Sequence, residues 1–330
     1  MRHLRTFRYV DTVARVGSIR GAADSLAITA SALNRRILAL EEELGVAIFE
    51  RLPHGVRPST AGELLLHHIR TQFADIERLQ SQIADLSGVR RGRVAIASSQ
   101  APLSYLLPEQ VARYRIEHPG VTFVLQLRDR TAVTQALIDH SADLAIAFEH
   151  APSPDFHPLL SVRQRVHAVM SATHPLAAQA ELRLRDCLAF PTVVPAFPHG
   201  VRQLLETALA GSSRRLEPVI ESDSFEFLSR SVRDGELITF QIPVGLSDEV
   251  SRGPGKEREA ETGKAGSTRR RGNDDARPAA TAPDLIARPL AERDVPPGTL
   301  SLGQLRGRAL PVAAARFAES LSRVLAERYS

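Results

Sequence analysis

The sequence predicts a winged helix-turn-helix domain, a long linker helix and a two-lobed α/β domain within 330 residues. Two short amphipathic helical patterns joined by a tight turn predict the first part. A narrow apolar seam predicts the linker helix, and alternating strand and helix patterns predict the lobes. We expect domains over 1–59, 60–88 and 89–330, with lobe I formed by 93–163 and 292–330 and lobe II by 164–291.

The composition is that of a globular protein with a sizeable core. Hydrophobic residues make up 43% of the chain and charged residues 24%. No apolar run approaches the roughly 20 residues that span a bilayer, so we expect no membrane partner. The first residues lack the apolar centre of a signal peptide. Cys187 is the only cysteine, so no internal disulfide can form, and we expect a cytoplasmic protein.

The first 44 residues predict three helices. A helix over 4–16 ends at Gly17, and Ser18 is a good N-cap for the second helix, which buries Ala22 and Ala23. Thr29 can cap the third helix. Its apolar residues recur on one face and predict a single buried stripe, comprising Leu33, Ile37, Leu40 and Leu44.

The opposite face of the third helix suits the reading of DNA. Ser31, Arg35 and Leu38 point away from the stripe, with Asn34 beside them. Arginine and asparagine make the most discriminating contacts with base edges in the major groove. An ordinary solvated helix face could carry the same residues, but the arrangement of short helix, turn and helix favours double-stranded DNA as the partner.

A two-stranded wing is expected next, in the segment IFERLPHGVRPSTAGE. Gly55 supplies its turn. Arg51, His54 and Arg57 then lie where DNA phosphates would pass. Thr60 and Glu63 form a capping box that starts a new helix.

That helix carries a seam that is typical of a coiled coil. The seam residues are Leu65, Ile69, Gln72, Ile76, Leu79, Ile83 and Leu86. We expect a homodimer through 60–86, in preference to packing of the seam on the chain's own body, with Gln72 fixing the register. A two-fold dimer places two recognition helices one DNA turn apart, about 34–36 Å, so the expected DNA site is a near-palindrome.

The remaining chain predicts two α/β lobes. Lobe I is expected to contain strands over 94–97, 121–127 and 144–148 with helices over 103–118 and 133–140. After a crossing near 161–165, the pattern restarts with strands over 166–170, 219–221 and 237–242 and a helix over 201–210. A helix over 310–327 closes lobe I. Such alternation indicates parallel sheets with flanking helices, and two similar lobes fit the architecture of solute-binding proteins.

The carboxyl end of the first strand in lobe I is a candidate anion site. It reads Ala97-Ser98-Ser99-Gln100 and opens directly onto a helix. Ligands of open parallel sheets bind at the carboxyl ends of strands, and hydroxyls with backbone N–H groups at a helix start can hold an anion. The expected effector is therefore a carboxylate. The alternative, that Ser98 and Ser99 only cap the helix, stays open.

Residues 249–283 interrupt the α/β pattern with many glycine, proline and charged residues, and we expect a disordered insertion there. Lys256 and Lys264 lack the flanking residues of a phosphate loop. The chain shows no metal-ligand spacing, no nucleophile elbow and no paired carboxylates at a strand end. We therefore expect no enzyme activity, no catalytic residues, no bound metal and no cofactor.

Two stretches of the N-terminal part resemble the LysR-type transcriptional regulators. They read GSIRGAADSLAITASALNRRILALEEELGVAIFER and GVRPSTAGELLL. Ala30 stands where a glutamine is common and Ser31 where a proline is common, which bears on base preference. The resemblance implies that Ala30, Ser31, Asn34 and Arg35 face the bases and that Arg36 lies nearer the backbone.

The same resemblance extends to the lobes and implies an effector domain like type 2 periplasmic binding proteins. Ser99 matches a serine that commonly contacts the effector, Thr131 a second polar position, and Phe148 a position near the hinge. Phe197 and His199 are expected across the cleft. The family also implies a tetramer built from dimers.

The expected function is transcriptional regulation modulated by a small-molecule effector bound between the lobes. The alternative is a solute-binding or sensor protein without direct gene regulation.

Overall fold

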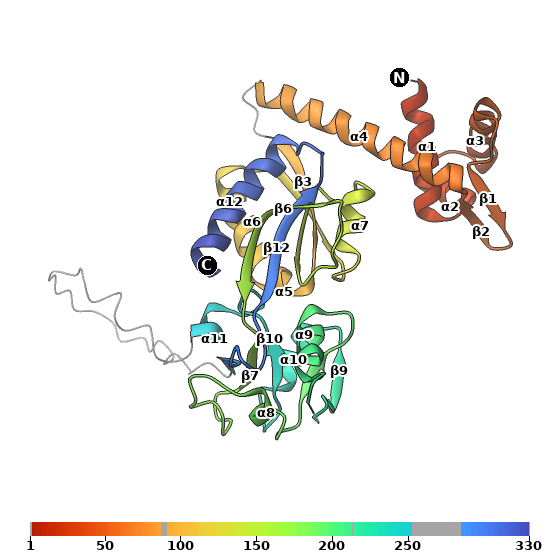
Figure 1. Ribbon diagram of the computed structural model, residues 1–330. Helices are drawn as coiled ribbons and strands as arrows, with labels where there is room; N and C mark the ends of the chain where they lie inside the picture. The colour runs from red at the N-terminus through yellow and green to blue at the C-terminus, as the bar shows by residue number, and fades with distance from the viewer. Residues whose placement is uncertain (1, 87–90, 213, 253–284, 330) are drawn as a thin grey trace, which may run out of the picture. The chain divides into compact units, whose positions relative to one another are not determined.

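The computed structural model describes residues 2–86, 91–212, 214–252 and 285–329 (Figure 1). Contacts divide the chain into two compact units, Met1–Val89 with Ile138–Ser141 and Arg90–Leu137 with Ala142–Ser330. Most of the predicted insertion, including both lysines, lies outside the described residues. Within the described part of the chain, no helix combines the length and apolar character needed to cross a membrane.

The first unit is a winged helix-turn-helix with a long helix attached. It contains α1 (Arg2–Val16), α2 (Ile19–Ser25), α3 (Ala30–Leu44), the antiparallel strands β1 (Phe49–Leu52) and β2 (Gly55–Pro58), and α4 (Thr60–Leu86). The predicted caps are confirmed. Ser18 Oγ accepts a hydrogen bond from Gly21 N at 3.3 Å, and Thr29 Oγ1 accepts one from Ala32 N at 3.2 Å.

Two local predictions in this unit are wrong. Leu44 is 47% exposed, so the buried stripe of α3 ends at Leu40. The helix itself ends at Leu44, because the next residue, Gly45, adopts a left-handed conformation with φ of 69°. The cap of α4 is Ser59, whose Oγ accepts from Gly62 N at 3.0 Å, because Thr60 is already helical.

The predicted seam of α4 serves two purposes. Ile69 is fully buried and Leu65 half-buried in the core of the first unit, where α4 packs against α1. Farther along, Leu79 and Ile83 are each 55% exposed. The prediction that the whole seam avoids the chain's own body is therefore wrong for its first turns.

Lobe I holds a five-stranded sheet in the order β4-β3-β5-β12-β6. Its strands are β3 (Arg91–Ser98), β4 (Gly120–Leu127), β5 (Leu144–Phe148), β6 (Phe156–Gln164) and β12 (Gly298–Leu305). The first three are parallel as predicted, whereas β12 runs antiparallel to both β5 and β6. The helices are α5 (Gln100–Ser104), α6 (Leu106–Glu117), α7 (Val133–Ile138) and α12 (Val312–Tyr329).

The helix predicted over 103–118 is two helices, α5 and α6, which meet at Tyr105. The backbone of Tyr105 leaves the helical region, with φ of −134° and ψ of −51°. The closing C-terminal helix is confirmed, because α12 buries Ala314, Phe317 and Leu321 against lobe I.

Lobe II has a mixed arrangement instead of the parallel sheet predicted. An antiparallel sheet runs in the order β10 (Thr239–Gln241), β7 (His167–Ser171), β11 (Leu285–Pro289). A parallel pair, β8 (Val193–Pro195) and β9 (Ile220–Ser222), joins it through a bridge between Thr192 and Ile238. The helices are α8 (Leu184–Cys187), α9 (Gly200–Leu209), α10 (Phe225–Ser231), α11 (Asp248–Arg252) and the 3-10 turn η1 (Pro243–Gly245).

The start of the predicted disordered insertion is helical. Residues 249–252 belong to α11, whose Val250 packs against the core and whose first turn carries Asp248 and Glu249. Acidic residues are favourable at the positive end of a helix.

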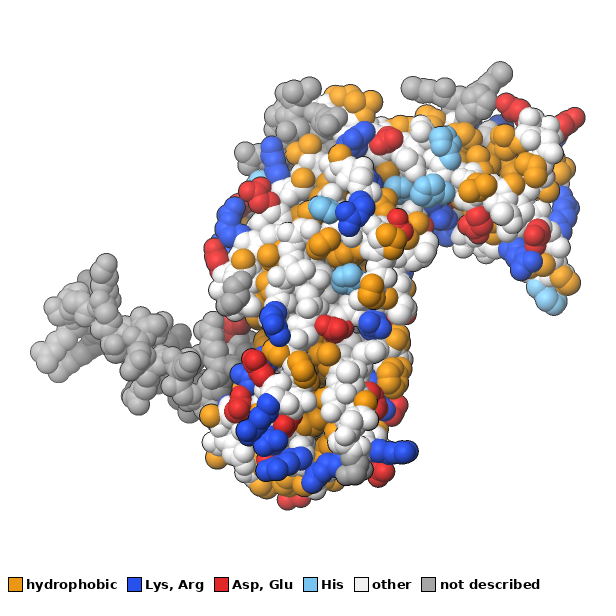
Figure 2. Space-filling model, viewed as in Figure 1, with side chains coloured by type: hydrophobic (Ala, Val, Ile, Leu, Met, Phe, Trp, Pro, Cys, Tyr) orange, Lys and Arg blue, Asp and Glu red, His pale blue; other side chains and the backbone are white. Residues whose placement is uncertain are grey.

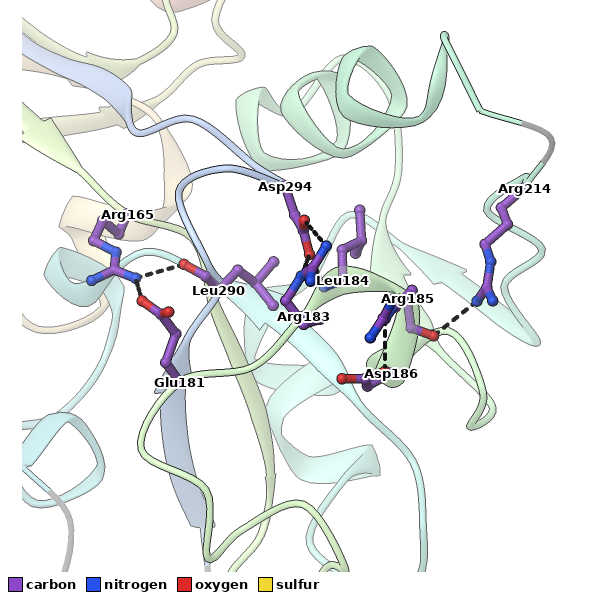
Figure 3. A network of polar contacts seen from close by, with 9 residues as sticks. All are labelled: Arg165, Glu181, Arg183, Leu184, Arg185, Asp186, Arg214, Leu290 and Asp294. Carbon is purple, nitrogen blue, oxygen red and sulfur yellow. Dashed lines mark hydrogen bonds and ion pairs between the residues drawn. The ribbon is translucent and has the colours of Figure 1, made fainter.

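Polar contacts hold the segment that leads from lobe II back to β12 of lobe I (Figure 3). The Arg183 guanidinium donates two hydrogen bonds to the Asp294 carboxylate, at 2.7 and 2.8 Å. These bonds hold the pKa of Asp294 below its ordinary value. Nearby, Arg165 donates to Leu290 O at 2.7 Å and pairs with Glu181. Figure 2 shows further basic side chains interspersed with acidic ones over the end of lobe II that lies away from lobe I.

Candidate functional site

The predicted recognition face of α3 is exposed within the first unit. Ser31, Arg35 and Arg36 are exposed, while Ala30 and Asn34 are half-buried. Leu33 and Ile37 on the other side are buried in the core. The helix therefore presents a small polar and basic surface of the kind that enters a major groove.

A hydrogen bond joins this face to the wing. Arg51 Nη2 on β1 donates to Asn34 Oδ1 on α3 at 3.2 Å, a contact that the sequence did not reveal. Arg57 Nε pairs with Glu50 at 2.7 Å, and His54 is exposed at the turn. Arg36 lies over the Tyr9 ring, 5.5 Å from its centroid. Each of the contacts of Arg51 and Arg57 uses one N–H group of the arginine, so the remaining N–H groups can donate to phosphates.

The wing is held against the loop after α1 by a close approach of two glycines. A Cβ on Gly55, whose φ is 144°, would lie 2.3 Å from Gly17 O. Val56 N donates to the same oxygen at 2.9 Å. Because no side chain fits between them, the wing has a fixed position beside the helix-turn-helix.

The second candidate site is a small cavity between the lobes, about 20 Å³ in volume, which has room for about one water. Lobe I contributes Ser99, Gln100, Arg130 and Phe148, and lobe II contributes His199 and Phe225. Three of the predicted effector residues, Ser99, Phe148 and His199, are thus brought together.

Ser99 has an unused hydroxyl in this cavity. Its Oγ is buried, and none of the described residues hydrogen-bonds it. Ser99 is the N-cap residue of α5, but its side chain makes no capping bond. The interpretation that this serine only caps the helix is therefore wrong, and its hydroxyl is left available for a ligand.

The other predicted residues are not among the described residues that line the cavity. Ser98 is fully buried, and its hydroxyl donates to Ser99 O at 2.8 Å. The Thr131 hydroxyl donates to Asp129. Phe197 is 56% exposed, and its ring lies 5.1 Å from the Arg202 guanidinium.

Arg130 is the charged lining residue that was not predicted from the sequence; Gln100 and Phe225 also line the cavity and were not predicted as site residues. Arg130 is half-buried, its Nε donates to Glu149 O, and it forms no ion pair with any carboxylate in the described part of the chain. The signal was present, because Arg130 follows the carboxyl end of β4, at the same sheet edge as Ser99.

Arg130, not His199, supplies the positive charge of the cavity at neutral pH. Burial lowers the pKa of His199, while Asp223 and Asp129 oppose that shift. His199 Nε2 lies 3.7 Å from Asp223 Oδ1. A hydrogen bond from Thr131 lowers the pKa of Asp129, which keeps that carboxylate charged. Within the described residues, no His, Cys, Asp and Glu side chains cluster as metal ligands.

Comparison with known proteins matches both units to one family. The model described as "Bacterial regulatory helix-turn-helix protein, lysR family" matches residues 4–63, and that described as "LysR substrate binding domain" matches residues 87–260. The HTH-type transcriptional regulator CbbR of Sinorhizobium medicae is 30% identical over 260 residues, covering 76% of this chain and 80% of that protein. The HTH-type transcriptional activator CmpR of Synechocystis is 23% identical over 251 residues, covering 76% and 82%.

Solved structures share the fold over nearly the whole chain. A full-length OxyR variant from Pseudomonas aeruginosa has a TM-score of 0.66 at 19% identity, covering 96% of this chain and 94% of that one. Full-length CbnR, solved in complex with its target DNA, has a TM-score of 0.58 at 17% identity, covering 97% and 99%.

Proposed function

The chain belongs to the LysR family of bacterial transcriptional regulators, and we propose that a carboxylate effector bound between its lobes modulates its promoter binding or activation. The observation that supports the effector class is a pair of donor side chains in one cavity, the Ser99 hydroxyl, which has no hydrogen-bond partner among the described residues, and the Arg130 guanidinium, which forms no ion pair there. A guanidinium binds a carboxylate with two parallel hydrogen bonds, and a hydroxyl can donate a third.

On DNA, α3 would lie in the major groove of a near-palindromic site. Ala30, Ser31, Asn34 and Arg35 would face the bases. The phosphate contacts would come from Arg36, Arg51, His54 and Arg57. The exposure of α3 supports this assignment, as does the shared fold with CbnR, which is described bound to its target DNA. Acting on promoter DNA implies a cytoplasmic location.

Self-association would use the far part of α4. Leu79 and Ile83 are apolar and exposed there. Within the first unit, a groove of about 470 Å³ runs between α1 and α4, and its lining includes charged residues such as Arg8 and Asp11 as well as Phe73 and Ile76. A second α4 would pair with the exposed seam, and two such dimers would form a tetramer. The linker and dimerisation segment is thus proposed to span 60–88, between the DNA-binding domain (1–59) and the effector domain (89–330).

The effector would act by changing the balance of two arrangements of the lobes. The cavity holds about one water, so a carboxylate requires the cleft to open first. A ligand shifts such a balance only by binding one arrangement more tightly than the other.

A titration with small carboxylates, namely acetate, pyruvate, succinate and benzoate, tests the effector class by calorimetry. We expect at least one to bind, and Arg130→Ala to weaken it at least about tenfold, equivalent to ~1.4 kcal/mol. Arg128→Ala is the matched control, since Arg128 is exposed and lies outside the cavity lining. Equal affinities in wild type and Arg130→Ala would contradict the proposed site.

A further inference from the structure

The Gln100 side chain forms a hydrogen bond that links the two lobes at the cavity. Gln100, the first residue of α5 in lobe I, accepts a hydrogen bond at its Oε1 from Phe225 N, the first residue of α10 in lobe II, at 3.1 Å. The first N–H groups of a helix have no partner within the helix. Ser224 Oγ satisfies Phe227 N at 3.2 Å, so α10 takes one partner from its own cap and one from across the cleft.

Two glycines let the lobes come into contact around this hydrogen bond. A Cβ on Gly200, at the start of α9, would lie 2.7 Å from Phe148 O. A Cβ on Gly245, in η1, would lie 3.0 Å from the Cβ of Ala101 on α5. Backbone therefore meets the opposite lobe directly on both sides, and the cavity left between them is about 20 Å³.

We propose that Gln100 is a latch that holds the cleft closed without a ligand, and that an effector must displace its side chain in order to enter. Gln100 lines the same cavity as Ser99 and Arg130, and its oxygen already occupies the acceptor position at Phe225 N. A carboxylate oxygen can take over that position, and as a charged acceptor it makes a stronger hydrogen bond than an amide does.

This role makes Gln100 a determinant of effector specificity. A ligand that fits must carry an acceptor oxygen for Phe225 N in addition to the groups that meet Arg130 and Ser99. A ligand without that acceptor leaves the N–H buried and unpaired, which disfavours binding.

The latch can be tested in the full-length protein without any ligand. Spin labels on cysteines at two exposed positions, Arg128→Cys in lobe I and Glu226→Cys in lobe II, report the distance between the lobes. Labelled chains are diluted with unlabelled ones so that each oligomer carries one labelled pair. The native Cys187 is fully buried, and burial raises its pKa to about 12, so it does not react with the label.

Gln100→Met keeps the length of the side chain and removes the acceptor. We expect it to raise the population with the longer inter-lobe distance about fivefold, equivalent to ~1 kcal/mol. Gln100→Glu, which keeps an acceptor oxygen, should retain the wild-type distance. The matched control is Gln203→Met at an exposed position of α9, which should also leave the distance unchanged.

The proposal is overturned if Gln100→Met has the wild-type distance distribution, or if Gln203→Met shifts it equally. The proposal that an effector displaces the Gln100 side chain rests on the proposed effector site. The distance between the lobes in the absence of ligand does not depend on that site. An open cleft in Gln100→Met together with no carboxylate binding would support the latch and contradict the effector class. Carboxylate binding together with unchanged distances would support the effector class and contradict the latch.

Discussion

Arg35 is the residue on which sequence-specific binding should depend most. It is exposed at the middle of the recognition face of α3, and the two buried residues Leu33 and Ile37 fix the orientation of that face. Arg35→Ala should weaken specific binding to the DNA upstream of the protein's own gene by about 1–3 kcal/mol. Fluorescence anisotropy at fixed salt measures this, with Arg113→Ala, an exposed arginine of α6, as control. Wild-type affinity in Arg35→Ala would show that α3 does not read the bases.

His167 should make the fold sensitive to acid. Burial lowers its pKa from 6.5 to about 4. Between pH 4 and pH 6.5 the unfolded chain binds a proton at this histidine that the folded chain does not. The free energy of unfolding therefore falls as the pH drops from 6.5 toward 4. The contribution of the neutral, buried His167 is fully present above pH 6.5. The loss at the acid end is about 3 kcal/mol.

Urea unfolding at pH 7.5 and at pH 5 measures this dependence. His167→Gln should lose part of the acid sensitivity, whereas His157→Gln, at an exposed position, should keep it. If both variants follow the wild-type pH profile, the burial of His167 does not control acid stability.

Sequence reasoning at the residue scale succeeded where the physics is local. Ser18 and Thr29 were identified as caps because a hydroxyl and the N–H groups that it accepts from lie within one turn of chain. Arg130 was missed because its importance comes from distant partners. Only the fold brings its guanidinium beside Ser99, and its neighbour Thr131, chosen instead, is occupied by Asp129.

The element most open to direct test is the far part of α4. Leu79 and Ile83 are exposed at successive seam positions, and a charge placed at either would have to be buried in a dimer. Leu79→Glu with Ile83→Glu should weaken self-association at least about tenfold, as measured by sedimentation equilibrium. Leu64→Glu is the control, since Leu64 is 73% exposed and is not one of the seam residues. Unchanged association in the double variant would place the dimer contact elsewhere.

Among the elements, helices and parallel strands with strong periodicity were predicted from the sequence, and pairing directions were not. The span of α4 and the parallel strands β3, β4 and β5 were found from periodicity. The antiparallel partners β6 and β12 were not, because they pair across more than 130 intervening residues (Phe156 with Leu305, for example). The local sequence pattern does not show which distant strand pairs with which.

At the scale of the whole molecule, one chain combines a DNA-reading unit, an amphipathic helix with an exposed apolar seam, and a two-lobed domain with a small cavity between its lobes. An effector that opens the cavity can affect DNA binding only through a difference in its affinity for the two arrangements of the lobes. A tenfold difference corresponds to ~1.4 kcal/mol, which is enough to be seen in binding curves.

The most direct test of the central claim is the affinity of the full-length protein for its own upstream DNA, measured with and without the carboxylate that calorimetry identifies. We expect that carboxylate to change the affinity or the footprint of the wild-type protein, and to have a much smaller effect at the same concentration on Arg130→Ala, which should still bind the DNA. An identical response in wild type and Arg130→Ala, or no response in wild type despite proven binding, would contradict effector control through the cleft.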